Sequence, residues 1–158
     1  MRLVLAVVLA AVVTGTAAAQ RETTRATLYA AASLTDAFPK IAPQARFSFA
    51  GSNALAAQIR QGAPADVFAS ANMKIPFGLY ADGHCSKPVV FTRNALVLIL
   101  PRKNPAHIRR LGDLRRKGVK LVIAAKGVPV GDYTLQVLEK LKLTGVLKNV
   151  VSRETDVR

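Results

Sequence analysis

Serine hydroxyls and backbone amides at the start of expected helices are the groups in this chain best suited to hold a ligand. Ser33 follows an apolar, strand-like run over 28–32, and apolar side chains then recur at helical spacing. Ser52 occupies the same position before a second helical pattern. Helix N-termini offer unpaired N–H groups and a partial positive charge, so the two serines are suited to bind one small anion.

A simpler alternative is that the two serines only cap helices. Ser33 is the expected N-cap of a helix over 34–41, with Asp36 three residues further on, as in a capping box. Ser52 is the expected N-cap of a helix over 53–61. Because such caps are common, either serine alone favours the structural role.

A third turn changes that balance. After an expected strand that ends at Ala125, Pro129 precedes a helix in which Val130 and Gly131 present free backbone N–H groups. Tyr133, in the first turn of that helix, adds a phenolic O–H. A fully ionised tetrahedral oxyanion needs only donors, and neutral donors avoid the desolvation cost of a buried counter-charge. The three turns together therefore predict an oxyanion site.

Residues suited to catalysis or to metal binding are few. His84 and His107 lie in polar contexts without metal-ligand spacing, and no G-x-S-x-G elbow is present. Cys85 is the single cysteine, so no disulfide can form within the chain. For the carboxylates of Asp36 and Asp66, a structural role is a simpler explanation than a catalytic one. We therefore expect no enzymatic activity, no cofactor and no direct metal ligand.

The chain is strongly basic, with a formal net charge of +14 and an isoelectric point near 10.8. Much of the excess lies in one stretch, which holds Arg102, Lys103, Arg109, Arg110, Arg115, Arg116, Lys117, Lys120 and Lys126 against Asp113. The simplest interpretation of this basic stretch is a face exposed to solvent. The second interpretation is that it steers a small anion toward the protein. No aromatic side chains alternate with these cations, so the segment offers no platform for nucleic-acid bases, and we expect no nucleic-acid partner.

The first 19 residues have the pattern of a signal peptide. A basic start is followed by an apolar run over 3–13 that is too short to span a bilayer, and Ala17–Ala19 provides a small-residue cleavage site. We expect secretion across the inner membrane and a mature chain that starts at Gln20. An uncleaved anchor is the less favoured alternative.

The remaining pattern alternates strands with helices. Strands are expected over 26–31, 46–49, 66–70, 89–92, 95–100, 120–125 and 149–152. Helices are expected over 34–41, 53–61, 75–81, 109–116 and 131–143. This alternation predicts an α/β fold with mainly parallel sheets, whose ligands lie at the carboxyl ends of the strands.

Four strings resemble one family. Ala-Ala-Ala-Ser-Leu-Thr-Asp-Ala (30–37), Phe-Ala-Gly-Ser-Asn-Ala-Leu-Ala-Ala-Gln-Ile (49–59), Gly-Ala-Pro-Ala-Asp-Val-Phe-Ala-Ser-Ala (62–71) and Val-Pro-Val-Gly-Asp-Tyr (128–133) are similar to the periplasmic molybdate-binding proteins of molybdate ABC transporters. The resemblance covers nearly all of the chain after residue 19. Four motifs in order make it specific.

The resemblance implies a two-lobed type II periplasmic-binding fold. We expect a first lobe over 20–93 and a partial second lobe over 94–158. The implied ligand is molybdate or tungstate, held in the periplasm by a monomer that delivers it to a membrane permease. The implied ligand residues are Ser33, Ser52, Val130, Tyr133 and Val157; the last of these rests on the resemblance alone.

The sequence also departs from the family. Family members continue beyond the turn at Val157 with elements that complete the second lobe, so we expect that lobe to be incomplete. Pro39 lies inside the first expected helix and predicts a kink or a shortened helix. From these departures we expect marginal stability and weak or absent oxyanion binding. Another tetrahedral oxyanion such as sulfate, a remnant that binds nothing, and a basic secreted interaction protein are the alternatives.

Overall fold

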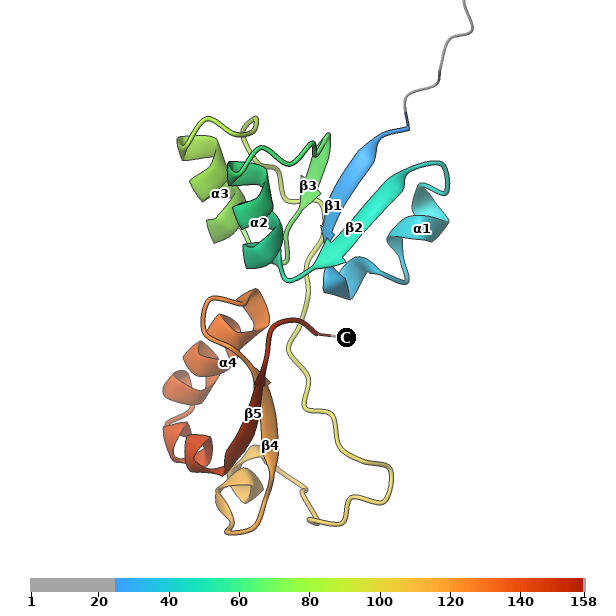
Figure 1. Ribbon diagram of the computed structural model, residues 1–158. Coiled ribbons are helices and arrows are strands. Elements are labelled where there is room, and N and C mark those ends of the chain that lie inside the picture. Colours follow the sequence, from blue (N-terminus) through green and yellow to red (C-terminus); the bar gives the residue numbers. More distant parts are fainter. Residues whose placement is uncertain (1–24, 158) are drawn as a thin grey trace, which may run out of the picture.

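The computed structural model describes residues 25–157. The expected signal peptide over residues 1–19 lies outside this range. The described chain forms two separate sheets, each made of parallel strands, and a long irregular segment joins them. One sheet lies above the other in Figure 1. No helix in the described range has the length and apolar character needed to cross a bilayer.

The first sheet has three strands in the order β2-β1-β3, all parallel. Its strands are β1 (Thr27–Ala31), β2 (Arg46–Ala50) and β3 (Val67–Ala69). Tyr29 of the central strand faces Ser48 on one side and Phe68 on the other. Three helices flank this sheet: α1 (Phe38–Ile41), α2 (Ser52–Arg60) and α3 (Lys74–Ala81). In Figure 1, α2 and α3 lie together near β3, whereas α1 lies beyond β2.

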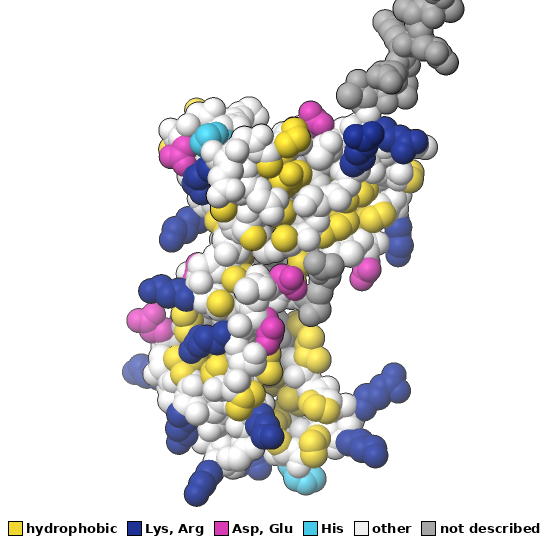
Figure 2. Space-filling view, in the orientation of Figure 1, with side chains coloured by type: hydrophobic (Ala, Val, Ile, Leu, Met, Phe, Trp, Pro, Cys, Tyr) yellow, Lys and Arg dark blue, Asp and Glu magenta, His cyan; other side chains and the backbone are white. Residues whose placement is uncertain are grey.

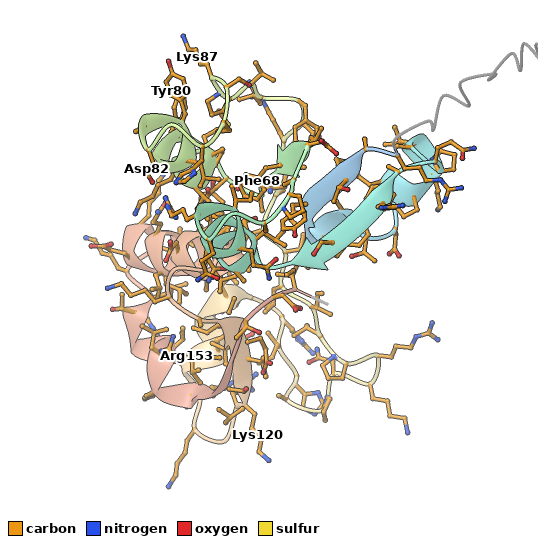
Figure 3. The ribbon with its side chains drawn as sticks, turned by 45° about the horizontal axis from the view of Figure 1, so that its top comes forward. Phe68, Tyr80, Asp82, Lys87, Lys120 and Arg153 are labelled. Atoms are coloured by element: carbon orange, nitrogen blue, oxygen red, sulfur yellow. The ribbon has the colours of Figure 1, made fainter. Side chains whose placement is uncertain are left out.

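Small residues and two leucines form the core of this first unit. Leu55 of α2 and Leu79 of α3 are fully buried, and Ala30 of the central strand is buried with them. An ion pair on the surface joins the same helices, with 2.9 Å between Arg60 Nε and Asp82 Oδ2. Asp82 directly follows α3, as Figure 3 shows. Both side chains are about half exposed, so the pair adds little stability, and the buried leucines hold the two helices together.

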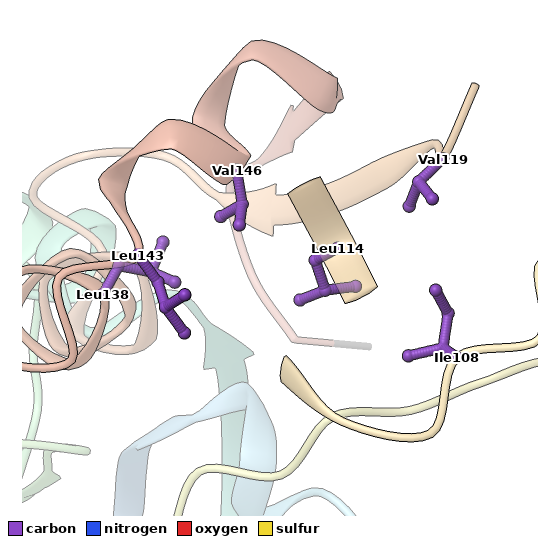
Figure 4. Close-up of a cluster of buried hydrophobic side chains, with 6 residues drawn as sticks. All are labelled: Ile108, Leu114, Val119, Leu138, Leu143 and Val146. Carbon is purple, nitrogen blue, oxygen red and sulfur yellow. The ribbon is translucent and has the colours of Figure 1, made fainter. Parts of the chain in front are cut away.

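The second sheet has two parallel strands, β4 (Leu121–Ala124) and β5 (Val150–Glu154). The helix α4 (Pro129–Lys140) and two 3-10 helices, η2 (Leu111–Arg115) and η3 (Thr144–Asn149), surround it. A cluster of apolar side chains fills the space between these elements (Figure 4); it consists of Ile108, Leu114, Val119, Leu138, Leu143 and Val146. Each unit therefore has its own core.

The expected helix over 34–41 is wrong. A 3-10 helix, η1 (Ala32–Leu34), is followed by a turn, and an α-helix begins only at Phe38. Proline cannot donate the hydrogen bond that a helix interior needs, but it is tolerated in the first turn. Pro39 occupies that first-turn position, so the helix starts late and is short. The shortened helix predicted from Pro39 is thus confirmed.

The expected strands over 89–92 and 95–100 are also wrong. Residues 88–100 are irregular and form no backbone–backbone hydrogen bonds with any other residue of the described range 25–157. Their apolar side chains are exposed; Val97 is 77% and Ile99 84% exposed. A strand exists only when a neighbour pairs with it, and within residues 25–157 no strand lies beside this segment.

The expected polar helix over 109–116 is replaced by the single 3-10 stretch η2. Asp113 accepts hydrogen bonds from the backbone amides of Arg109 (2.8 Å) and Arg110 (3.0 Å). A short acidic side chain that binds nearby amides competes with a regular helix, and Gly112 weakens the helix further. The remaining expected strands and helices form within one or two residues of their expected bounds, apart from α4, which ends three residues earlier than expected.

Candidate anion-binding site

A cavity of about 270 Å³ lies between the two units. All five residues expected to contact an oxyanion line it: Ser33, Ser52, Val130, Tyr133 and Val157. Ligand pockets for drug-sized molecules measure roughly 300–1,000 Å³, so this cavity suits a smaller solute. The structure thus brings together residues that are separated by up to 124 positions in the sequence.

Ser33 lies in η1, directly after the central strand β1. It is exposed, and no side-chain hydrogen bond caps the turn. Its expected role as the N-cap of a helix over 34–41 is therefore wrong, because the helix does not start there. The hydroxyl stands at the carboxyl end of a parallel strand, where ligands of open α/β sheets bind.

Ser52 is the first residue of α2 and not its N-cap. Gly51 is the N-cap, and no side chain caps this helix. Ser52 is 1% exposed, and its hydroxyl oxygen accepts a hydrogen bond of 3.0 Å from the amide of Ala71. A hydroxyl has one hydrogen to donate and two lone pairs. The bond from Ala71 uses one lone pair, which leaves the hydroxyl hydrogen for a ligand.

Val130 and Tyr133 belong to the first turn and a half of α4, which begins at Pro129 with Val128 as N-cap. The first N–H groups of an α-helix have no partner within the helix, so the amide of Val130 points out of its N-terminus. Asp132 Oδ1 accepts a hydrogen bond of 2.8 Å from Gly127 N and holds the preceding turn. The N-termini of α2 and α4 thus both border the cavity, each with its partial positive charge.

Val157 follows β5 in a stretch without regular structure. Its side chain is 46% exposed, and it reaches the cavity together with Asp156. Among the described residues that line this cavity, none is Lys or Arg. The donors are therefore neutral hydroxyls and amides, as the sequence suggests.

Asn94 is a cavity residue that sequence reasoning missed. Its side-chain amide donates a hydrogen bond of 3.3 Å to the carbonyl oxygen of Ala71, the residue whose amide holds Ser52. A signal for Asn94 was present in the sequence, because it is a polar residue between the two apolar runs over 89–92 and 95–100. Leu96, Val97 and Ile99 also line the cavity and make this side of it apolar.

A larger cavity, of about 980 Å³, runs along β3 and the irregular segment. Of the five expected contacts, Tyr133 alone also lines it. Asp66, His84 and Cys85 are among the residues that border it. Within residues 25–157 no group of three or more His, Cys, Asp or Glu residues could hold a metal ion. The smaller cavity is the better candidate site, because all five expected contacts line it.

The basic residues of 102–126 do not enter the candidate site. Figure 2 shows Lys and Arg side chains spread over the surface of both units, and Figure 3 shows Lys120 and Arg153 on the second unit. Arg116 donates hydrogen bonds to the carbonyl oxygens of Ala106 (2.6 Å) and His107 (2.9 Å) and so holds a loop. Part of the basic segment thus has a structural use.

Comparison with known proteins gives a consistent result. Residues 26–158 match the family of bacterial extracellular solute-binding proteins. The chain is 37% identical over 154 residues to the molybdate-binding protein ModA of Mycobacterium tuberculosis H37Rv. That match covers 82% of this chain and 58% of the relative. It is 35% identical over 151 residues to molybdate-binding protein ModA of Haemophilus influenzae (85% of this chain, 59% of that protein).

The molybdate-binding protein ModA of Escherichia coli is 32% identical over 156 residues, with 84% of this chain and 58% of that protein covered. The chain therefore spans just under three fifths of the length of these relatives. A solved substrate-binding domain from Clostridium difficile matches with a TM-score of 0.43 at 23% identity, over 81% of this chain and 61% of that one.

Proposed function

This chain belongs to the family of bacterial extracellular solute-binding proteins, and we propose that it captures molybdate in the cavity between its two sheets. The observation that carries the proposal is that Ser33, Ser52, Val130, Tyr133 and Val157 line one small cavity. The names of the relatives point to the same anion. The family is one of solute-binding proteins that act outside the cytoplasm, so the role is binding and not catalysis.

The chemistry of the site fits a tetrahedral dianion. Hydroxyls of Ser33 and Ser52 approach from the first unit, and the N-terminus of α4 approaches from the second. A charge-assisted hydrogen bond contributes roughly 1.5–3 kcal/mol, and each helix N-terminus adds about 0.3–1 kcal/mol. Several such donors together offset the cost of taking the anion out of water and of ordering the walls. Tungstate has the same shape and charge and is the second ligand that we propose.

The wider assignment is supported by the sequence pattern of residues 1–19, by the family and by the names of the relatives. We propose that the units around β1–β3 and β4–β5 are the two lobes, with the boundary near residue 93. We also propose that residues 1–19 direct export, that the protein acts as a monomer, and that it delivers molybdate to the permease of an ABC transporter.

Isothermal titration calorimetry of the 158-residue chain with sodium molybdate tests the proposal. We expect saturable but weak binding at one site, as the departures from the family predict, with competition by tungstate. Sulfate, titrated in parallel, distinguishes a molybdate site from a general oxyanion site. Absence of heat with all three anions, in a chain that circular dichroism shows to be folded, would refute the function.

A further inference from the structure

Gly51 is a glycine whose backbone conformation does not require glycine. Its φ of −58° and ψ of 136° are open to any residue, and it serves as the N-cap of α2. Four other described glycines, in contrast, have positive φ; they are Gly62, Gly83, Gly118 and Gly127. The lack of a side chain at Gly51, which is buried, therefore needs another explanation.

The explanation lies in the approach of Thr155. A Cβ atom on Gly51 would lie 2.6 Å from the carbonyl oxygen of Thr155, closer than real Cβ atoms come to non-bonded atoms of other residues. The next nearest atom is Asn53 Oδ1 at 2.9 Å, at the end of a flexible side chain that can rotate away. Thr155 O belongs to the backbone and cannot rotate away without moving its segment. A side chain at position 51 would thus separate these two segments.

The two segments belong to opposite walls of the candidate site. Gly51 precedes Ser52 in the first unit, and Thr155 precedes Asp156 and Val157, which line the cavity from the second unit. Figure 1 shows the chain beyond β5 running up to the space below β2, near the start of α2. The close approach therefore lies where the wall that carries Val157 meets the wall that carries Ser52.

We propose that Gly51 is a positioning residue for closure of the site: its missing side chain lets the segment of Thr155 come close enough for both walls to contact one oxyanion. This inference rests on the proposed function. A methyl group at position 51 raises the free energy of the closed form, in which it meets Thr155 O. An open form, in which the segment of Thr155 has moved away, lacks that contact, so the methyl group penalises the closed form selectively. The apparent affinity falls by the factor by which the closed fraction falls.

The test compares Gly51→Ala with Gly51→Ser in molybdate binding. Alanine is a poorer N-cap than glycine, whereas serine is a better one. If position 51 acts only through the cap of α2, the serine variant binds as tightly as the wild type. If it acts through closure, both variants bind about tenfold more weakly or worse, since both carry a Cβ. Gly145→Ala is the matched control, because nothing lies within 4 Å of a Cβ at that position.

Kinetics separate closure from general damage. The anion enters the open form, so stopped-flow measurements should show an association rate that is not lowered and a dissociation rate raised about tenfold or more in both Gly51 variants. A merely structural defect would instead lower the number of binding sites per chain. Wild-type dissociation rates in Gly51→Ala and Gly51→Ser would overturn the inference.

A measurement without ligand keeps this inference distinct from the proposed function. Spin labels at Gln58→Cys on α2 and Arg153→Cys on β5, in a Cys85→Ser background, report the distance between the units by double electron–electron resonance; residues 58 and 153 are both exposed. We expect a longer distance with Gly51→Ala or Gly51→Ser and an unchanged one with Gly145→Ala. If the wild type binds no molybdate, the function fails and this distance alone decides: equal distances in all four proteins would refute closure control by Gly51.

Discussion

The backbone amide of Ala71 donates a hydrogen bond of 3.0 Å to the hydroxyl oxygen of Ser52. The bond joins the first residue of α2 to the segment after β3, two elements that both leave the carboxyl end of the first sheet. It fixes the orientation of a buried hydroxyl and leaves its hydrogen free to be donated. Ser52 is therefore both a structural link and a candidate ligand contact.

Replacing Ser52 should affect both stability and binding. In Ser52→Ala the part-buried amide of Ala71 loses its acceptor, which costs about 1–3 kcal/mol of unfolding free energy. The loss of one charge-assisted hydrogen bond should weaken molybdate binding by roughly 10- to 100-fold. Thermal unfolding and calorimetric titration measure the two effects.

Replacing Ser33 should affect binding alone. Ser33 is exposed and caps no helix, so Ser33→Ala should leave the melting temperature within about 1 °C of the wild type while it lowers the molybdate affinity by a similar factor. Ser86→Ala, on an exposed residue that does not line the candidate site, is the control for both serines. An unchanged affinity in both cavity variants would remove the serines from the site.

Gly131→Ala should destabilise the second unit. A Cβ at Gly131 would collide with the carbonyl oxygen of Ala125 and would lie 2.7 Å from that of Ala124, so α4 can pack on the end of β4 only without a side chain there. Such overpacking costs about 1–3 kcal/mol, and we expect the melting temperature to fall by several degrees. Gly112→Ala, which meets nothing within 4 Å, should melt like the wild type; equal melting of both variants would contradict the packing at Gly131.

Asp113 should make stability depend on pH in the acid range. Hydrogen bonds from the amides of Arg109 and Arg110 hold the pKa of its carboxyl below the usual value, with nearby guanidinium groups adding to the effect. Because the folded-state pKa is depressed, this stabilisation is fully present above the unfolded-state pKa, near 4, and is lost as the pH falls through the folded-state value.

Asp113→Asn should therefore lower the melting temperature at pH 7, and the difference from the wild type should shrink as the pH is lowered from about 4 to 2. Thermal melts at a series of pH values measure this. Asp36→Asn, at an exposed position in the first unit, is the control. A constant difference between wild type and Asp113→Asn across that range would show that the carboxylate charge does not matter.

Residues 88–100 should exchange their amide hydrogens rapidly. Within the part of the chain that the structure describes, this segment forms no backbone–backbone hydrogen bonds, so its amides need no opening event before they exchange. Peptides from α2 and β4, whose amides are bonded within a helix and a sheet, should exchange far more slowly in the same mass-spectrometric experiment. Slow exchange over 95–100 would instead indicate that the segment pairs as a strand in solution, as its sequence pattern suggests.

The sequence determined the local elements and the types of the ligand-binding groups. Apolar periodicity placed β1, β2, α2 and α4 within one to three residues, because apolar spacing is a local property of the chain. Ala30 of β1, Leu55 of α2 and Leu138 of α4 are buried. Strand-to-helix turns placed Ser33, Ser52 and Val130 at strand ends, since turn chemistry is local. The late start of α1 likewise follows from Pro39 alone.

Tertiary structure decided what those elements contact. The pattern over 95–100 is that of a strand, yet no neighbour pairs with it in the described chain, and pairing is not a local property. Ser52 has the sequence signature of an N-cap, but its hydroxyl binds Ala71 because β3 ends beside it. Gly51 carries no local signal at all, since its φ is ordinary. Its meaning comes from Thr155, more than a hundred residues away, which approaches too closely for a side chain to fit.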